Sequence, residues 1–256
     1  MIQLRKNLVL LIVDDDKDMR ETVCFEFQMR GLKFFEAGDG NEALKILATE
    51  KIDLVISDIR MPNRDGISLL ETMRQKNGVM PPLIFMSGFA DIAIWDAYDF
   101  GAEAFFGKPF DIEKIVSYVD LLTKPRNLLW SEKIREEPKH TLALTFKDPE
   151  HAASDEGFSI GRGGIFLGAW QNKFRRDDTI GFKLEIAGST LAIEGTGILR
   201  WVRTSPSEGL PAGCGIEFSY LNPEIKNKYL QITEKSQPIA YIPRGPRKKN
   251  GVKAQP

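Results

Sequence analysis

The first 123 residues alternate short apolar runs with segments of helical periodicity, and this alternation restricts the fold more than any other feature. Five apolar runs are each followed by an amphipathic stretch, and they read NLVLLIV, LKFFEA, DLVIS, PLIFM and AFF. Apolar runs of this length are typical of strands that are buried on both faces of a parallel sheet. Right-handed crossovers then place helices over both faces. Residues 1–123 are therefore predicted to form a doubly wound α/β domain with a five-stranded parallel sheet.

The remainder of the chain has a different sequence pattern. Residues 124–139 are charged and contain Pro125, which cannot continue a helix, so this segment is predicted to be a linker. Residues 140–235 hold short strand-like runs separated by Gly, Asn, Asp and Pro, followed by one helical stretch, and this pattern indicates a small all-β barrel with a C-terminal helix. Residues 236–256 are rich in Pro, Gly, Lys and Arg, and we expect a basic, disordered tail.

The composition is that of a protein without a membrane segment. No apolar run approaches the roughly 20 residues that a spanning helix needs, and the N-terminus lacks a signal-peptide pattern. The two cysteines, Cys24 and Cys214, lie far apart and suit buried, reduced thiols. We therefore expect a cytoplasmic protein with no membrane insertion.

Reactive side chains follow four of the predicted strands. Ligands bind beyond the carboxyl ends of the strands in an open parallel sheet, so these side chains should meet at one edge. Three carboxylates at one edge repel one another unless a hard cation lies among them, and Mg²⁺ prefers such oxygen ligands. The residues concerned are Asp14, Asp15, Asp58, Ser87 and Lys108.

This set can accept a phosphoryl group. Asp58 is the candidate nucleophile, while the cation and the ammonium of Lys108 neutralise charge on the transferred oxygens and the hydroxyl of Ser87 bonds to one of them. The alternative is that the aspartates only cap a helix and that Lys108 is solvated. That alternative is reasonable for one residue, but not for five residues of the required types at four strand ends.

Over about residues 5–123 the sequence resembles the response regulator receiver family, which has a flavodoxin-like fold. The matching segments are LIVDDDKDMR, LVISDIRMPNRDG, LIFMSGFAD and GAEAFFGKPF. The resemblance implies that a sensor histidine kinase phosphorylates Asp58. It also implies that Asp14, Asp15, Asp58 and the backbone carbonyl of Arg60 hold Mg²⁺.

The same resemblance assigns the remaining residues of the site. Ser87 and Lys108 contact the phosphate, and Ser87 and Phe105 form the switch. The Lys108–Pro109 bond is usually cis in the family, which is feasible for an X-Pro bond. Asp16 is free to cap the first helix with no catalytic role.

Ile94 and Tyr98, four residues apart on the fourth helix, form a second apolar pair beside the stripe that faces the core. Two interpretations stay open. The pair can flank the core, or it can form an interaction face, as receivers commonly present this helix to partners.

Residues from Arg135 to about Leu230 resemble the PilZ family, a small β-barrel that often binds cyclic di-GMP. The resemblance rests on GRGGIFLGAW, on GTGILRWV and on GCGIEFSYLNPEIKNKYLQI. It implies a nucleotide site, but the signature is altered: Lys139 stands where the family has an arginine and lacks its bidentate fork. We therefore expect absent or weak cyclic di-GMP binding. The candidate nucleotide-binding residues are Arg135, Lys139, Ser159, Arg162 and Gly164.

These observations favour a two-component response regulator that signals through a PilZ-like output domain by protein–protein contacts, in motility or surface behaviour, where the PilZ family often works. One alternative is an effector that integrates cyclic di-GMP binding with phosphorylation. Another is a transcriptional regulator, but the sequence has no helix-turn-helix pattern and a basic tail binds nucleic acid only non-specifically. We expect no enzymatic activity beyond self-phosphorylation. The sequence does not identify the downstream protein, and it leaves a homodimer open.

Overall fold

The computed structural model describes residues 4, 7–75, 80–88, 93–125, 128–131, 137–168, 174–189, 192–236 and 240–246. The chain divides into two compact units. The first comprises residues 1–129 and 239–241, and the second comprises residues 130–238 and 242–256. The division after residue 129 falls inside the predicted linker, whereas the return of residues 239–241 to the first unit was not predicted.

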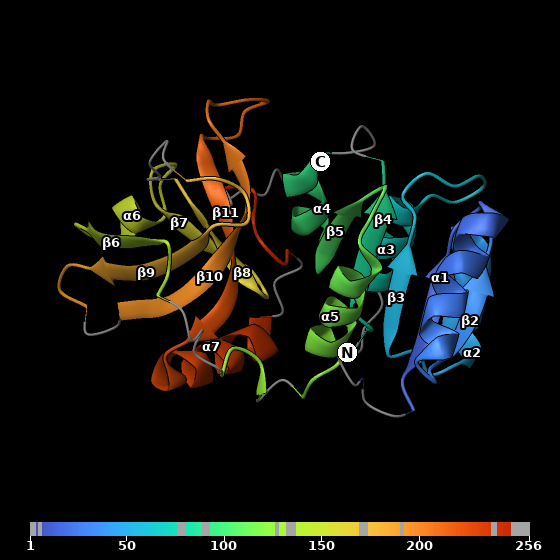
Figure 1. The fold of residues 1–256 in the computed structure, drawn as a ribbon. Coiled ribbons are helices and arrows are strands. Elements are labelled where there is room, and N and C mark those ends of the chain that lie inside the picture. The colour runs from blue at the N-terminus through green and yellow to red at the C-terminus, as the bar shows by residue number, and fades with distance from the viewer. Residues whose placement is uncertain are drawn as a thin grey trace. The chain divides into compact units, whose positions relative to one another are not determined.

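The first unit contains a five-stranded parallel sheet with the order β2-β1-β3-β4-β5 (Figure 1). Its strands are β1 (Val9–Val13), β2 (Lys33–Ala37), β3 (Leu54–Ser57), β4 (Leu83–Ser87) and β5 (Ala104–Gly107). Its helices are α1 (Lys17–Met29), α2 (Gly40–Thr49), α3 (Gly66–Gln75), α4 (Ile94–Phe100) and α5 (Ile112–Leu122). The predicted five-stranded doubly wound sheet is confirmed.

Apolar side chains bury both faces of this sheet. Alternate residues of β1 belong to two separate cores: Leu10 packs in the core that includes α1 and α5, and Leu11 packs in the core that includes α2, α3 and α4. Burial on both faces explains why the strands read as continuous apolar runs.

Aspartates begin four of the helices described in the first unit; Asp65 Oδ1 accepts from the N–H of Ser68 in the first turn of α3. The side chains of Asp16, Asp39 and Asp111 accept hydrogen bonds from backbone N–H groups in the first turns of α1, α2 and α5. These caps satisfy donors that have no partner within the helix. The expected capping role of Asp16 is confirmed.

The second unit is built on one mixed six-stranded sheet with the order β6-β9-β10-β11-β8-β7. Its strands are β6 (His140–Phe146), β7 (Phe158–Ile160), β8 (Gly164–Leu167), β9 (Thr179–Ile186), β10 (Ala192–Arg203) and β11 (Gly213–Leu221). β6 pairs with β9 in parallel and the other pairs are antiparallel. Two helices complete the unit, α6 (Pro149–Ala152) and α7 (Pro223–Ser236).

This sheet is a curled half-barrel rather than the predicted all-β barrel. Among the described residues, β6 and β7 end the strand order and do not pair with each other, so hydrogen bonding does not close the sheet. The predicted C-terminal helix is present as α7, while α6 was not predicted. Its signal was available, because Asp148 caps it and Pro149 occupies its first turn.

Glycines in β11 make room for aromatic rings. A Cβ on Gly213 would lie 2.4 Å from the ring of Phe166, and a Cβ on Gly215 would lie 2.2 Å from the ring of Trp201. Those two rings stack with centroids 6.0 Å apart. The GCG sequence is therefore explained by packing inside the unit.

Two segments outside the predicted domains are buried. Trp130, in the predicted linker, packs edge-on against Phe218 and Tyr229 of the second unit. Ala240, Tyr241 and Ile242 are also buried, so the expectation of a disordered tail is wrong for residues 240–246. Residues 247–256 lie outside the described residues.

In the described part of the chain, no helix has the length and apolar character required to cross a membrane.

Candidate functional site

The adjacent strands β1 and β3 bring three carboxylates to the carboxyl edge of the parallel sheet. Asp14 and Asp15 follow β1, Asp58 follows β3, and the backbone N–H of Asp58 donates to the carbonyl of Val13 at 2.7 Å. Asp14 and Asp58 are buried and Asp15 is exposed. One carboxylate oxygen of each lies within 4.8 Å of the others. The structure therefore brings these three predicted residues together.

The strands on the other side of β3 supply a hydroxyl and an ammonium. Ser87, at the end of β4, donates from Oγ to Asp58 Oδ1 at 2.5 Å. Lys108, just after β5, donates from Nζ to Asp14 Oδ2 at 2.9 Å and to Asp58 Oδ2 at 3.1 Å. The Lys108–Pro109 bond is cis, as expected. Both oxygens of the Asp58 carboxylate thus contact groups that can later bind phosphoryl oxygens.

Burial is the largest single influence on the pKa values of Asp14 and Lys108, but its net effect differs between them. Burial raises the pKa of Asp14, and the hydrogen bond and charge of Lys108 offset only part of that rise. For Lys108 burial acts in the lowering direction, but hydrogen bonds and charges from Asp14 and Asp58 together raise the pKa of its ammonium. The lysine therefore stays charged between the two carboxylates.

One glycine of the site was not singled out from the sequence. A Cβ on Gly66, at the start of α3, would lie 2.2 Å from the backbone carbonyl oxygen of Asp58. The N–H of Gly66 donates to the carbonyl of Ile59 at 2.8 Å. Gly66 therefore lets the loop after β3 fold tightly against Asp58. Its signal was its position at the end of the MPNRDG run.

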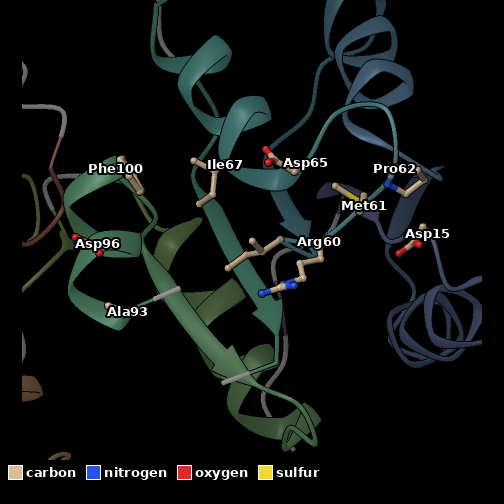
Figure 2. A pocket seen from close by; sticks show the side chains of 10 residues that line it. Asp15, Arg60, Met61, Pro62, Asp65, Ile67, Ala93, Asp96 and Phe100 are labelled. Atoms are coloured by element: carbon tan, nitrogen blue, oxygen red, sulfur yellow. The ribbon is translucent and has the colours of Figure 1, made fainter. Parts of the chain in front are cut away.

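A groove of about 680 Å³ opens beside the carboxylate cluster. Figure 2 shows residues from the loop after β3 and from α3 on one side and residues from α4 on the other. Asp15 and Arg60 lie in its lining, so the groove and the site share residues. The full lining is Asp15, Ile59, Arg60, Met61, Pro62, Asp65, Ile67, Ala93, Asp96 and Phe100.

The predicted switch and interaction residues occupy different environments. Phe105 is buried in the core beneath α4, and Ile94 packs at the edge of that same core. Tyr98 is only 2% exposed. In this structure Ile94 therefore flanks the core, and Tyr98 is covered.

The match to a family model lies within the first unit. Residues 10–120 match the model of the response regulator receiver domain. The DNA-binding transcriptional regulator NtrC of Klebsiella pneumoniae is 39% identical over 110 residues, which cover 43% of this chain and 23% of NtrC. The chain thus spans about a quarter of the length of that curated relative.

Two solved structures are also similar. The Francisella response regulator 1452 receiver domain is 31% identical, with 46% of this chain and 97% of that chain covered and a TM-score of 0.43. The response regulator TrrA of Thermotoga maritima, solved in complex with Mg²⁺ and BeF, is 28% identical, with 45% and 98% covered and a TM-score of 0.39.

The fold and the site together define a doubly wound α/β domain with an acidic cluster at the carboxyl edge of its parallel sheet. The family match then assigns it: residues 10–120 are a response regulator receiver domain of a two-component system. Receiver domains bind Mg²⁺ at an acidic pocket, and here the donor set is Asp14, Asp15 and Asp58. Three carboxylates beside one lysine suit a hard divalent cation that takes oxygen ligands.

The candidate nucleotide residues of the second unit are mostly engaged in the fold. Lys139 Nζ donates to Asp178 Oδ1 at 2.5 Å, and that carboxylate also accepts from the N–H of Arg175 and contacts His140 Nε2. The hydrogen bond from Lys139 leads the effects that lower the pKa of Asp178 to about 2. The positive charge of Lys139 is therefore already paired.

The other candidates lie apart from Lys139 in the strand order. Ser159 lies in β7, at the opposite end of that order from β6, and Arg162 is half-buried in the next turn. A Cβ on Gly164 would lie 2.3 Å from the carbonyl oxygen of Ile216, so this glycine is required by strand packing. Arg135 lies outside the described residues.

Proposed function

We propose that this chain is a phosphorylation-controlled response regulator whose phosphoacceptor is Asp58 and whose donor is a sensor histidine kinase. The proposal rests on one observation: both oxygens of the Asp58 carboxylate accept hydrogen bonds from side chains of the site. Oδ1 accepts from Ser87 and Oδ2 accepts from Lys108, next to two further carboxylates. The match to the receiver family over residues 10–120 supports it.

The residues suggest a simple reaction. An oxygen of Asp58 attacks phosphorus, a P–O bond forms, and the bond to the donor's leaving group breaks and takes its electron pair away with that group. Lys108 neutralises charge on the phosphoryl oxygens, and Ser87 donates to one of them. Asp14, Asp15, Asp58 and the carbonyl of Arg60 would hold Mg²⁺, which supplies further charge neutralisation.

Intact-mass spectrometry tests this proposal. With Mg²⁺ and a small phosphodonor, the wild-type chain should gain one phosphoryl group and Asp58→Asn should gain none. Asp65→Asn, an exposed aspartate in the loop after β3, is the matched control and should be phosphorylated like the wild type. Equal phosphorylation of the Asp58→Asn variant would contradict the proposal.

For the second unit we propose an output role through protein contacts, with no tight cyclic di-GMP site. The pairing of Lys139 with Asp178 supports this, because a phosphate would have to displace a hydrogen-bonded carboxylate. Loss of two charge-assisted contacts at about 1.5–3 kcal/mol each weakens binding on the order of a hundredfold or more. Calorimetric titration should show no tight binding; tight binding that a Lys139→Ala variant abolishes would overturn the proposal.

NtrC is named as a DNA-binding regulator, but its similarity to this chain covers only the receiver part. A transcriptional role is thus the second candidate. A gel-shift assay on genomic DNA fragments with excess random duplex DNA as competitor separates them: a transcriptional regulator should retain specific fragments, whereas the output proposal expects only weak, salt-sensitive binding that the competitor removes.

A further inference from the structure

The covered face of α4 is the feature from which a further inference follows. Tyr98 belongs to the pair that the sequence marked as a candidate interaction face, yet it is 2% exposed. The residue that covers it comes from the end of the described chain. The rings of Tyr98 and Tyr241 stack with centroids 6.3 Å apart and planes 22° apart.

A backbone hydrogen bond fixes the same contact. The N–H of Tyr241 donates to the carbonyl of Tyr98 at 2.9 Å. This carbonyl lies in the last turn of α4, where carbonyls lack partners within the helix. Gly101 donates to it as well, at 3.2 Å. The incoming segment therefore supplies a second donor to the end of a short helix.

The burial of Ala240 and Tyr241 shows that this segment packs against the first unit. Ala240 is fully buried, Tyr241 is 6% exposed, and both group with residues 1–129 as one compact unit. A stacked aromatic pair is worth more than the area that it buries. The chain thus provides its own occupant for this face.

The site geometry links this contact to the phosphoacceptor. Ser87 ends β4, the strand before α4, and its hydroxyl is bonded directly to the Asp58 carboxylate. A phosphoryl group on Asp58 draws that hydroxyl toward a phosphoryl oxygen. α4 follows β4 in the chain, and the start of α4 has no side-chain cap to hold it, since Ala93 is its N-cap.

We propose that Ala240 and Tyr241 form an intramolecular cap on α4 that occupies the signalling face while Ser87 is bonded to the Asp58 carboxylate, and that phosphorylation releases it. The cap and a downstream protein then compete for Tyr98. The release of the cap by phosphorylation rests on the proposed function. The contact of the cap with α4 does not depend on the proposed function. Coupling between two sites is reciprocal, so loss of the cap must also favour phosphorylation.

Hydrogen exchange of the full chain tests the cap without any phosphodonor. Tyr241→Ala removes the ring and should increase exchange across residues 94–101 compared with the wild type. Tyr241→Phe keeps the ring and is the matched control, so it should exchange like the wild type. Exchange in β1 should be the same in all three chains, which shows that the receiver remains folded. Unchanged exchange across residues 94–101 in Tyr241→Ala would overturn the proposal.

Phosphorylation tests the coupling. Addition of Mg²⁺ and a small phosphodonor should raise exchange around residues 240–242 in the wild type but not in Asp58→Asn. At equal phosphodonor concentration, the equilibrium ratio of phosphorylated to unphosphorylated chain should be about fivefold higher or more in Tyr241→Ala, the lower end of typical coupling between sites. If the wild type is phosphorylated on Asp58 and neither result appears, the release mechanism fails and the proposed function stands. If no chain is phosphorylated, the proposed function itself fails.

Discussion

Replacement of Lys108 by methionine should lower the stability of the receiver domain in Mg²⁺-free buffer. The ammonium lies 2.9 Å from Asp14 Oδ2 and 3.1 Å from Asp58 Oδ2. Each such pair attracts by about 5 kcal/mol at an effective dielectric constant of about 20, and the lost hydration of the ions offsets much of that energy. Breaking a buried pair usually costs about 3–5 kcal/mol.

The expected loss is smaller than that range because solvent screens part of the interaction. The side chain of Lys108 is 23% exposed, so we expect the free energy of unfolding to fall by about 2–3 kcal/mol. Mg²⁺ should restore stability, since a ligand that binds only the folded state at 100 times its Kd adds about 2.7 kcal/mol. The cation replaces the charge that the substitution removes.

Urea-dependent hydrogen exchange of peptides from β1 and β3 measures this free energy in the receiver itself. Lys114→Met, which replaces an exposed lysine of α5, is the control and should change stability by less than about 0.5 kcal/mol. The reasoning is refuted if Lys108→Met is as stable as this control without Mg²⁺. It is also refuted if saturating Mg²⁺ stabilises the wild type and not the variant.

Two further predictions concern the second unit. The ionised carboxylate of Asp178 should stabilise the second unit above about pH 4. Pairing with Lys139 lowers the pKa of Asp178 to about 2, against an ordinary value of 3.8. The stabilisation is therefore lost as the pH falls from about 4 to about 2. Asp178→Asn should thus lower the free energy of unfolding by about 1–2 kcal/mol at pH 7 and by almost nothing at pH 2. Urea unfolding at both pH values measures this difference. An equal loss at both pH values would contradict the pairing of Asp178 with Lys139. Gly215→Ala should cost about 1–3 kcal/mol because its Cβ would overlap the buried ring of Trp201, and an unchanged melting temperature would contradict it.

The receiver site could be predicted because the residues singled out for it lie at or just beyond the ends of strands. Parallel strands end at one edge, so the order of the apolar runs is enough to place Asp14, Asp58 and Lys108 together. The role of Gly66 depends on a close approach to a backbone carbonyl, which no periodicity reveals. The sequence alone also did not show that Lys108 contacts two carboxylates at once.

The second unit could be predicted only in part. Strands and the final helix were located from alternation and turn residues, but the parallel pairing of β6 with β9 and the open strand order depend on contacts between distant segments. The pairing of Lys139 with Asp178 and the covering of Tyr98 by Tyr241 are long-range contacts of the same kind. No local pattern in the sequence encodes any of these contacts.

The central claim is that phosphoryl transfer occurs on Asp58, and reductive trapping tests it most directly. Borohydride converts an aspartyl phosphate to homoserine, and peptide sequencing by mass spectrometry then locates the modified residue. After incubation with Mg²⁺ and a small phosphodonor, homoserine should appear at position 58 and at no other aspartate, and omission of Mg²⁺ or the phosphodonor should prevent it. Homoserine at Asp14 or Asp15 instead, with position 58 unmodified, would contradict the account.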